Sequence, residues 1–228
     1  MSFEESLHSK WRYVWIVAMG VVAALYMLRT NSVFYFDGGD NAYYILLAKS
    51  LAQGHGYRDW FLPGNHPHTI FPPVFPLLLS SIIKIRGVDI FAIKLFVSMS
   101  AVAALLATVV LLKKKSFAFP VASAIWFGCS YRFFNLADDV LTEPIFIALS
   151  FLALIAADKY FEKETPASFI FLIAAAWVAG LTRSAAISLI PAIFIAYLIK
   201  NGLSKRGVVK VIALAGIIII PLLLWNLR

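Results

Sequence analysis

Long stretches without a charged side chain alternate with short polar segments along most of this chain. Lipid offers no hydrogen bonds to a backbone, so such stretches must span a membrane as helices, whereas barrel strands would alternate polar and apolar residues. The pattern therefore predicts an all-α membrane protein, a single transmembrane module over residues 1–228. We expect about seven transmembrane helices, at about 12–29, 90–112, 116–132, 141–158, 166–182, 184–199 and 209–227.

Composition supports this class and excludes two others. Hydrophobic residues make up 61% of the chain and charged residues 14%, against about 25% charged in soluble domains. A water-soluble globule of this size could not bury that much apolar surface. The net charge of +8 comes from lysines and arginines scattered between apolar stretches, which is typical of membrane proteins and not of nucleic-acid binding. Cys129 is the only cysteine, so a disulfide framework and a cysteine metal site are excluded.

The first apolar stretch follows Lys10 and Arg12, as in a signal peptide. It is longer than the roughly 7–15 apolar residues of a signal peptide, and no small-residue cleavage site follows it. We interpret it as an uncleaved first span.

The positive-inside rule sets the predicted orientation. With the amino terminus in the cytoplasm, the lysines at 113–115 and the loops 159–163 and 200–210 lie inside, and the segment 30–88 lies outside. The apolar segment 72–83 begins with two prolines and is too short to span; counting it as a span would also move the three lysines outside. We expect a bacterial or archaeal cytoplasmic membrane protein whose functional site faces away from the cytoplasm.

The outer loop 30–88 is the only long polar segment, and two surface helices are expected in it. Residues 40–53 show the apolar spacing of an amphipathic helix, ended by Gly54-His55-Gly56, and 72–84 forms a second, half-buried helix. Lys94, near the start of the second span, is interpreted as a lysine that extends its amine to the membrane surface.

Several ionisable residues share the predicted outer side, and each also has a structural interpretation. The acids can cap helices, an arginine in a tight turn can anchor at the interface, and histidines in a loop can be ordinary polar groups. Ionisable groups at membrane level nevertheless mark functional sites by default, and arginine grips phosphate oxygens. The candidates are Asp37, Asp40, His66, His68, Asp138, Asp139, Glu143 and Arg183.

In order, the chain carries Asp40-x-x-Tyr43-Tyr44-x-x-x-Ala48, then Phe71-Pro72-Pro73-x-Phe75-Pro76, then Leu141-Thr142-Glu143-Pro144, then Gly180-Leu181-Thr182-Arg183. With this series it resembles the polyprenyl-phosphate-sugar-dependent glycosyltransferases of the GT-C superfamily. That group includes the dolichyl-phosphate-mannose–protein mannosyltransferases and the aminoarabinose transferases of lipid A. Some members carry an acidic-basic pair before the prolines, where this chain has Ile70-Phe71.

The resemblance implies a GT-C-like fold and an enzyme that moves a sugar from a polyprenyl phosphate to a lipid, glycan or protein acceptor. It implies that Asp40 helps the acceptor attack the anomeric carbon and that Arg183 holds the departing phosphate. Asp139 is expected to be the supporting catalytic acid. The expected substrate-binding residues are Asp37, Tyr43, Tyr44, Asp138, Glu143 and Arg183.

Three matters stay open at this stage. The cofactor is unknown: a divalent metal could stabilise the leaving phosphate, with Asp40, Asp139, His66 and His68 as candidate ligands. A transporter or flippase for a lipid-linked substrate, or a non-catalytic membrane subunit, is the alternative function. The chain is also expected to be the front module of a longer enzyme, because relatives continue with further spans.

Overall fold

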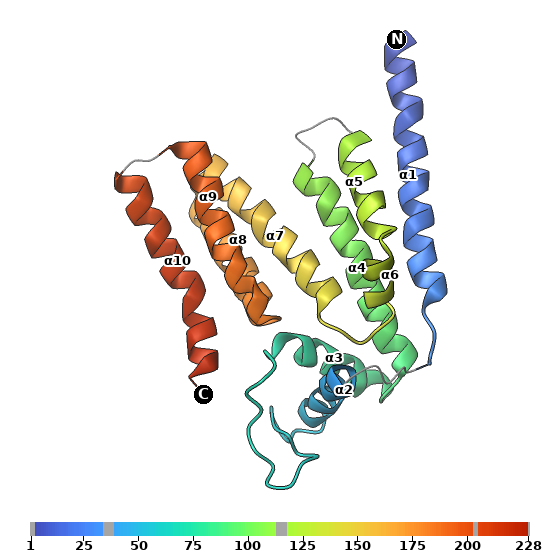
Figure 1. Ribbon diagram of the computed structural model, residues 1–228, viewed down its shortest axis with the longest axis vertical. Coiled ribbons are helices and arrows are strands. Elements are labelled where there is room, and N and C mark those ends of the chain that lie inside the picture. The colour runs from blue at the N-terminus through green and yellow to red at the C-terminus, as the bar shows by residue number, and fades with distance from the viewer. Residues whose placement is uncertain (1–2, 34–38, 113–117, 203–204, 228) are drawn as a thin grey trace. The chain divides into compact units, whose positions relative to one another are not determined.

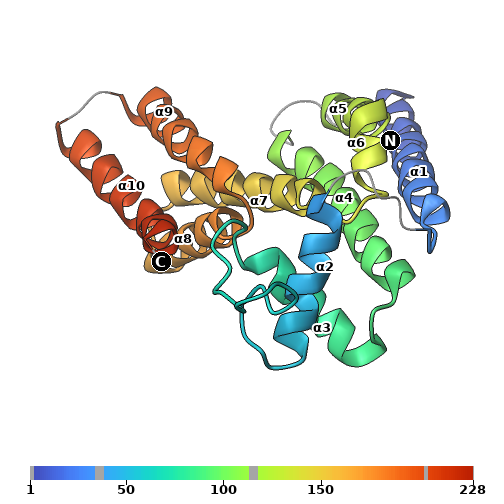
Figure 2. The same ribbon diagram turned by 60° about the horizontal axis from the view of Figure 1, so that its bottom comes forward.

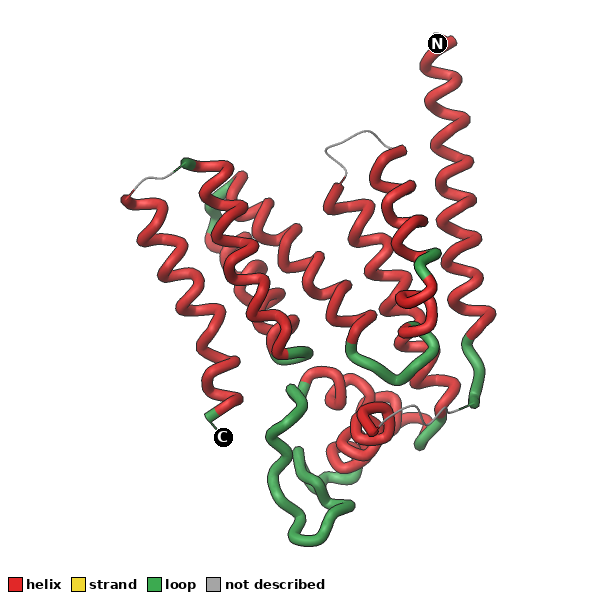
Figure 3. The backbone as a smooth tube through the Cα atoms, viewed as in Figure 1, coloured by secondary structure: helices red, strands yellow, loops and turns green. Residues whose placement is uncertain are grey.

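Each apolar stretch predicted to span the membrane corresponds to a helix in a computed structural model, which describes residues 3–33, 39–112, 118–202 and 205–227 (Figure 1). The helices are α1 (Phe3–Arg29), α2 (Gly39–Ala52), α3 (Val74–Arg86), α4 (Ile90–Leu112), α5 (Ala118–Gly128), α6 (Tyr131–Leu136), α7 (Glu143–Glu162), α8 (Pro166–Gly180), α9 (Leu189–Asn201) and α10 (Lys205–Asn226). A 3₁₀ helix, η1 (Ser184–Ser188), precedes α9. The described residues contain helices and loops but no strand (Figure 3).

Four helical segments are long and apolar enough to cross a membrane: Ile90–Leu112, Glu143–Glu162, Ser184–Asn201 and Gly207–Trp225. Three shorter apolar helices accompany them, Tyr13–Arg29, Ala118–Gly128 and Pro166–Gly180. The protein is therefore an all-α membrane protein, as predicted from its hydrophobic pattern.

The third predicted span was too long at its carboxyl end. Helix α5 stops at Gly128 instead of continuing to 132, and the short α6 restarts at Tyr131. Between them, Ser130 has extended backbone angles, φ −64° and ψ 130°, which interrupt the helix. The charge-free stretch continues to Tyr131, past the break, so the sequence pattern did not reveal it.

The chain forms two compact units, Met1–Ala42 with Asp89–Ala148, and Tyr43–Val88 with Leu149–Arg228. In the first unit, α1, α4 and α5 lie side by side (Figure 1). Their shared core contains Val22, Tyr26, Ala101, Leu105 and Ala124, and small alanines allow the helices to approach closely. The Tyr26 hydroxyl satisfies its hydrogen bond by donating to the Gly128 carbonyl oxygen at 2.6 Å.

In the second unit, α10 packs against both α8 and α9, and η1 contacts α8 and α9 (Figure 2). Helix α3 buries one face, with Phe75, Leu79 and Ile83 at the spacing of an amphipathic helix. Leu77 and Leu78 on α3 remain exposed, so this helix is half-buried as predicted.

Helix α2 ends where the sequence predicted, but it is more enclosed than a surface helix. No residue from 41 to 52 is exposed, and Leu47 and Ala48 are completely buried. Gly54 and Gly56 follow with φ of 82° and 81°, a conformation that favours glycine and stops the helix.

One end of the second unit collects the basic loops that were predicted to be cytoplasmic. Lys200 pairs with Asp158 at 3.5 Å, and Lys210 forms an ion pair with Glu164. Lys210 also lies over the ring of Tyr160. These contacts hold the α7–α8 connection beside the ends of α9 and α10.

Candidate active site

Two of the sequence motifs meet through the main chain in the second unit. The Val74 backbone N–H donates to the Leu181 carbonyl oxygen at 3.0 Å. This bond satisfies one of the otherwise unpaired N–H groups at the start of α3 and joins it to the turn after α8. The paired prolines 72–73 and the segment Gly180-Leu181-Thr182-Arg183 therefore lie together, although they are far apart in the sequence.

Gly180 permits this turn to lie close to α10. A Cβ atom added at Gly180 would come within 3.1 Å of the Leu222 side chain, closer than ordinary van der Waals contact. Thr182, next in the turn, is 1% exposed and donates its hydroxyl back to the Val178 carbonyl oxygen at 2.7 Å. The turn that carries Arg183 is thus fixed by its neighbours on both sides.

Arg183 stands at the N-cap of η1 with an extended backbone, φ −156° and ψ 134°. Its N–H donates to Ala179, and its carbonyl oxygen accepts from the Ala186 N–H. The residue is half-buried. These main-chain bonds fix the backbone of Arg183, and a guanidinium is a side-chain group that suits the binding of an anion.

The loop between α2 and α3, drawn green in Figure 3, is organised around a completely buried histidine. His68 Nδ1 lies 2.7 Å from Asp59 Oδ1, and His68 Nε2 accepts the Phe71 N–H at 2.9 Å. Because Nε2 is an acceptor, Nδ1 carries the hydrogen that is donated to Asp59. Both ring nitrogens are therefore occupied in holding the loop just before the paired prolines.

Aromatic side chains complete the packing of this loop. The Tyr57 hydroxyl donates to the Phe71 carbonyl oxygen at 2.8 Å, and its ring contacts Trp225 at the end of α10 with centroids 5.5 Å apart. Tyr43 packs on Phe61, His68 and Phe71, and Tyr44 packs on Phe71 and Phe75.

Tyr43 and Tyr44, the predicted substrate-binding pair, thus attach α2 to the loop between α2 and α3 and to the start of α3. Tyr44 is 4% exposed and Tyr43 is half-buried.

In the first unit, Asp138 is bound by two cations. Lys94 Nζ lies 3.0 Å from Asp138 Oδ1, and Arg29 Nε lies 3.8 Å from Oδ2. Lys94 is 2% exposed, and its amine also donates to Asn31 Oδ1 at 3.1 Å and to the Val33 carbonyl oxygen at 2.9 Å. The interpretation of Lys94 as a lysine that reaches the membrane surface is therefore wrong.

The roles of Lys94 and Arg29 were missed from the sequence, although a signal was present. Lys94 interrupts the apolar start of α4, and a charge inside a membrane span is expected to face a partner within the protein. Asp138 is that partner. The pairing fixes the α6–α7 connection, where Asp139 follows directly.

Asp139 and Glu143 flank the start of α7. Asp139 is half-buried, Glu143 stands in the first turn of α7, and Thr142 between them is 1% exposed. Acids at the start of a helix are stabilised by its dipole. Asp138, Asp139 and Glu143 belong to the first unit, and Arg183 belongs to the second.

Asp40 lies in the first turn of α2 and is exposed. Among the described residues, its carboxylate makes no ion pair or hydrogen bond. The neighbouring Asn41 is 4% exposed, and within the same described part its side-chain oxygen has no hydrogen-bond partner. The predicted Asp37 falls at 34–38, outside the described residues.

The candidate metal ligands do not form a cluster in the part of the chain that the structure describes. No group of three histidine, cysteine, aspartate or glutamate side chains there could hold a metal ion. His66 is exposed, and both ring nitrogens of His68 already have partners. Metal coordination by His68 would require the loop to give up the Asp59 or the Phe71 hydrogen bond.

A sequence comparison with protein families identifies the chain. The profile of the dolichyl-phosphate-mannose–protein mannosyltransferase family matches residues 66–225, which include the paired prolines, the start of α7 and the Arg183 turn. Asp40 lies before the matched segment. No curated protein matches the chain. Because the profile covers more than half of the chain, the protein belongs to the dolichyl-phosphate-mannose–protein mannosyltransferase family, a family of membrane glycosyltransferases.

Proposed function

We propose that this protein transfers a sugar from a polyprenyl-phosphate donor to an acceptor on the non-cytoplasmic face of the membrane. The hydroxyl oxygen of the acceptor forms a bond to the anomeric carbon, and the bond from that carbon to the phosphate oxygen breaks. The proton of the acceptor passes to a carboxylate, and the lipid phosphate departs with the bonding electron pair. Such a reaction needs a base near the acceptor and positive charge near the phosphate.

The hydrogen bond from Val74 to Leu181 is the observation that carries this proposal. It brings the two most separated motifs of the matched segment to one end of the second unit. Arg183 follows Leu181 by two residues, so its backbone lies at that end. The opposite end holds the Asp158–Lys200 and Glu164–Lys210 pairs, so the two ends of this unit differ in chemistry.

Asp40 is the proposed base. Its side chain is exposed and, within the described residues, is not committed to an ion pair, unlike Asp138. Asp139 is the proposed supporting acid, placed by the Lys94–Asp138 pair beside it. Glu143 is proposed to assist substrate binding from the first turn of α7, and Asp37 before α2 keeps its predicted role there.

The donor phosphate is proposed to bind Arg183, whose planar fork can contact two phosphate oxygens at once. A divalent metal, if the reaction uses one, would be held by the carboxylates of Asp40 and Asp139 in preference to the buried His68, because carboxylate oxygens are the ligands of Mg²⁺ and Mn²⁺.

Transfer from a panel of radiolabelled polyprenyl-phosphate sugars tests the proposal. Wild type should transfer one of these sugars, and Asp40→Asn should lose transfer while it reaches the membrane at the normal level. Asp158→Asn is the matched control, because Asp158 is a partly exposed carboxylate at the opposite end of the second unit and its variant should remain active. Normal turnover by Asp40→Asn would leave Asp40 with a purely structural role at the start of α2.

The same membranes distinguish the alternative functions. A transporter or flippase would move a lipid-linked sugar across the membrane of a vesicle without forming a new glycosidic bond. A non-catalytic subunit would do neither, and it would tolerate replacement of Asp40. Product formation by the wild type and its loss in Asp40→Asn exclude both.

A further inference from the structure

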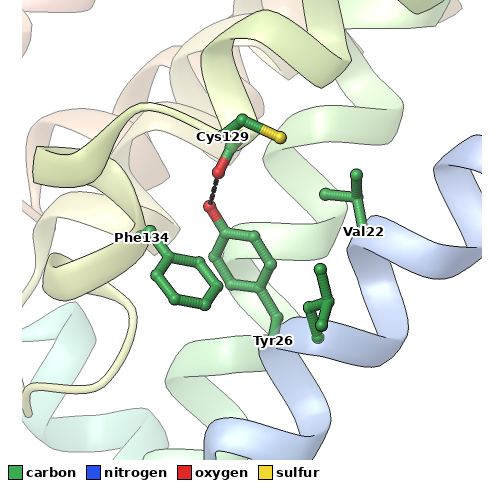
Figure 4. A pocket seen from close by; sticks show the side chains of 6 residues that line it. Val22, Tyr26, Cys129 and Phe134 are labelled. Carbon is green, nitrogen blue, oxygen red and sulfur yellow. Dashed lines mark hydrogen bonds between the residues drawn. The ribbon is translucent and has the colours of Figure 1, made fainter.

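An apolar hollow of about 200 Å³ lies on the first unit. Val22, Leu25 and Tyr26 of α1 form one wall, and Gly128, Cys129 and Phe134 form the other (Figure 4). The Tyr26 hydroxyl is already bonded to the Gly128 carbonyl oxygen, so the hollow offers its occupant almost only carbon. In a membrane protein, an open apolar hollow of this kind faces lipid chains.

One end of the hollow carries a positive charge. The Arg29 guanidinium lies over the ring of Phe134 at 4.5 Å, and Phe134 meets Tyr26 edge to face at 5.0 Å. Contacts from Arg29 to Phe134 and from Phe134 to Tyr26 therefore connect the guanidinium with the apolar side chains that line the hollow. Arg29 is seven residues after Val22, so the distance between these two residues along the axis of α1 is about 10 Å at 1.5 Å per residue.

Arg29 keeps hydrogen-bonding capacity for a ligand. Its terminal nitrogens donate to the Phe134 carbonyl oxygen at 3.0 Å and to Asn135 Oδ1 at 2.6 Å, which uses two of its five N–H groups. The side chain is 32% exposed. Arg29 shares the Asp138 carboxylate with Lys94, which is the nearer cation, at 3.0 Å against 3.8 Å.

We infer that this hollow binds one anionic phospholipid, whose phosphate contacts Arg29 and whose acyl chain lies along Val22, Leu25 and Tyr26. An apolar hollow with a cation at one end complements an acyl chain that is attached to a negatively charged headgroup. A zwitterionic lipid presents the same chains, but its own positive group competes for the phosphate. The inference rests on the membrane class of the protein and does not depend on the proposed transfer reaction.

Cys129, the only cysteine, lies in the wall of the hollow and is exposed, so its alkylation reports occupancy. The experiment compares full-length protein in nanodiscs of phosphatidylcholine with nanodiscs that also contain phosphatidylglycerol with the same acyl chains. An apolar maleimide should alkylate Cys129 about tenfold more slowly when phosphatidylglycerol is present, as expected for one charge-assisted hydrogen bond to the headgroup. Equal rates in the two membranes would overturn the inference.

Three variants assign the effect to the hollow. Leu25→Trp fills the hollow and should remove the dependence of the alkylation rate on phosphatidylglycerol. Val21→Trp, at an exposed position of α1 that does not line the hollow, should keep this dependence. Arg29→Gln should also remove the dependence. A dependence that survives both Leu25→Trp and Arg29→Gln would contradict the proposed site, and if Arg29→Gln fails to fold, Leu25→Trp decides.

A separate control excludes a general effect of membrane charge on thiol chemistry. Val17→Cys in a Cys129→Ala background places a thiol at another exposed position of α1. Its alkylation rate should be the same in both membranes. A slowing equal to that of Cys129 would show that phosphatidylglycerol acts on any thiol near this surface, and would overturn the assignment.

Discussion

Lys94 shows how a single residue can organise the end of a membrane-embedded unit. Its amine pairs with the Asp138 carboxylate and donates hydrogen bonds to Asn31 Oδ1 and to the Val33 carbonyl oxygen. A buried charge without such partners would be costly, so the pair and its hydrogen bonds must form together. Asp138 is therefore committed to structure, and Asp139 is the acid that this arrangement leaves beside it.

Lys94→Met is expected to destabilise the protein strongly. The substitution keeps most of the side-chain volume but leaves Asp138 buried with only the distant Arg29 contact. Breaking a buried ion pair from one side costs about 3–5 kcal/mol. Thermal unfolding of the purified protein in detergent measures the loss.

The double variant Lys94→Met with Asp138→Asn is the control for this prediction, because it removes the charge that the single variant leaves unpaired. It should recover much of the lost stability, while transfer activity should stay low if Asp139 depends on this pairing for its position. Lys200→Met, at an exposed pair, should change stability by less than about 1 kcal/mol. A Lys94→Met variant as stable as Lys200→Met would show that the buried pair is dispensable.

Arg183→Lys tests the proposed phosphate contact. Lysine keeps the positive charge but cannot reproduce the bidentate geometry of arginine, so we expect an increase in the KM for the donor of about tenfold, which corresponds to the loss of about one charge-assisted hydrogen bond. Steady-state kinetics with varied donor measures the effect. Arg132→Lys, at an exposed arginine of α6, should leave KM unchanged. Equal KM values for the two variants would indicate that Arg183 only anchors the turn at the interface.

At the scale of elements, the helices could be predicted well and their contacts could not. Apolar length alone located α4 at 90–112, and the spacing of Phe75, Leu79 and Ile83 gave the buried face of α3. The end of α5 could not be read from composition, because no charged residue occurs until Arg132, beyond Gly128. The partners of Lys94 and His68 also could not be assigned, because each depends on residues brought close only by packing or by loop conformation.

For the candidate site as well, the local motifs could be predicted from the sequence, and the contacts between them could not. Sequence motifs identified the paired prolines and the Arg183 turn, and the structure supplied the hydrogen bond that joins them. Residue type alone suggested that His68 could bind a metal. The main-chain N–H of Phe71, which occupies one of its nitrogens, cannot be recognised from sequence.

Close helix packing at Gly128 gives a prediction at this scale. A Cβ atom there would come within 2.8 Å of Leu105 and 3.2 Å of Val22, so Gly128→Ala should force α1 and α4 away from α5. We expect a loss of about 1–3 kcal/mol from overpacking, measured by thermal unfolding.

Gly180→Ala should cost less than Gly128→Ala, because its added Cβ atom meets a single side chain, Leu222 at 3.1 Å, whereas the added Cβ atom at Gly128 meets Leu105 at 2.8 Å and also Val22 at 3.2 Å. Gly216→Ala in α10 is the matched control, since nothing lies within 4 Å of its added Cβ atom. That variant should be neutral or more stable by up to about 1 kcal/mol, because alanine favours a helix. Similar stability of all three variants would contradict the proposed role of close packing.

At the scale of the whole molecule, the number of membrane crossings decides which loops share a compartment. Contacts in the second unit sort its loops into two ends. Tyr57 with Trp225, and Val74 with Leu181, define one end, and the Asp158–Lys200 and Glu164–Lys210 pairs define the other. If α8, α9 with η1, and α10 each cross the membrane, these ends lie in different compartments, and the positive-inside rule assigns the lysine-rich end to the cytoplasm.

Single cysteines at exposed positions of a Cys129→Ala protein test this assignment. Leu62→Cys and Ser184→Cys report on the end that carries Arg183, and Lys163→Cys and Asn201→Cys report on the lysine-rich end. In intact cells, a membrane-impermeant maleimide should label the first two, and it should label the other two only after the membrane is permeabilised. Labelling of Lys163→Cys together with Ser184→Cys, but not of Asn201→Cys, in intact cells would mean that α8, too short at Pro166–Gly180 to qualify as a span by length, does not cross. Labelling of only Lys163→Cys and Asn201→Cys would keep the crossings but reverse the orientation, and the Arg183 end would then face the cytoplasm, where the proposed transfer could not take place.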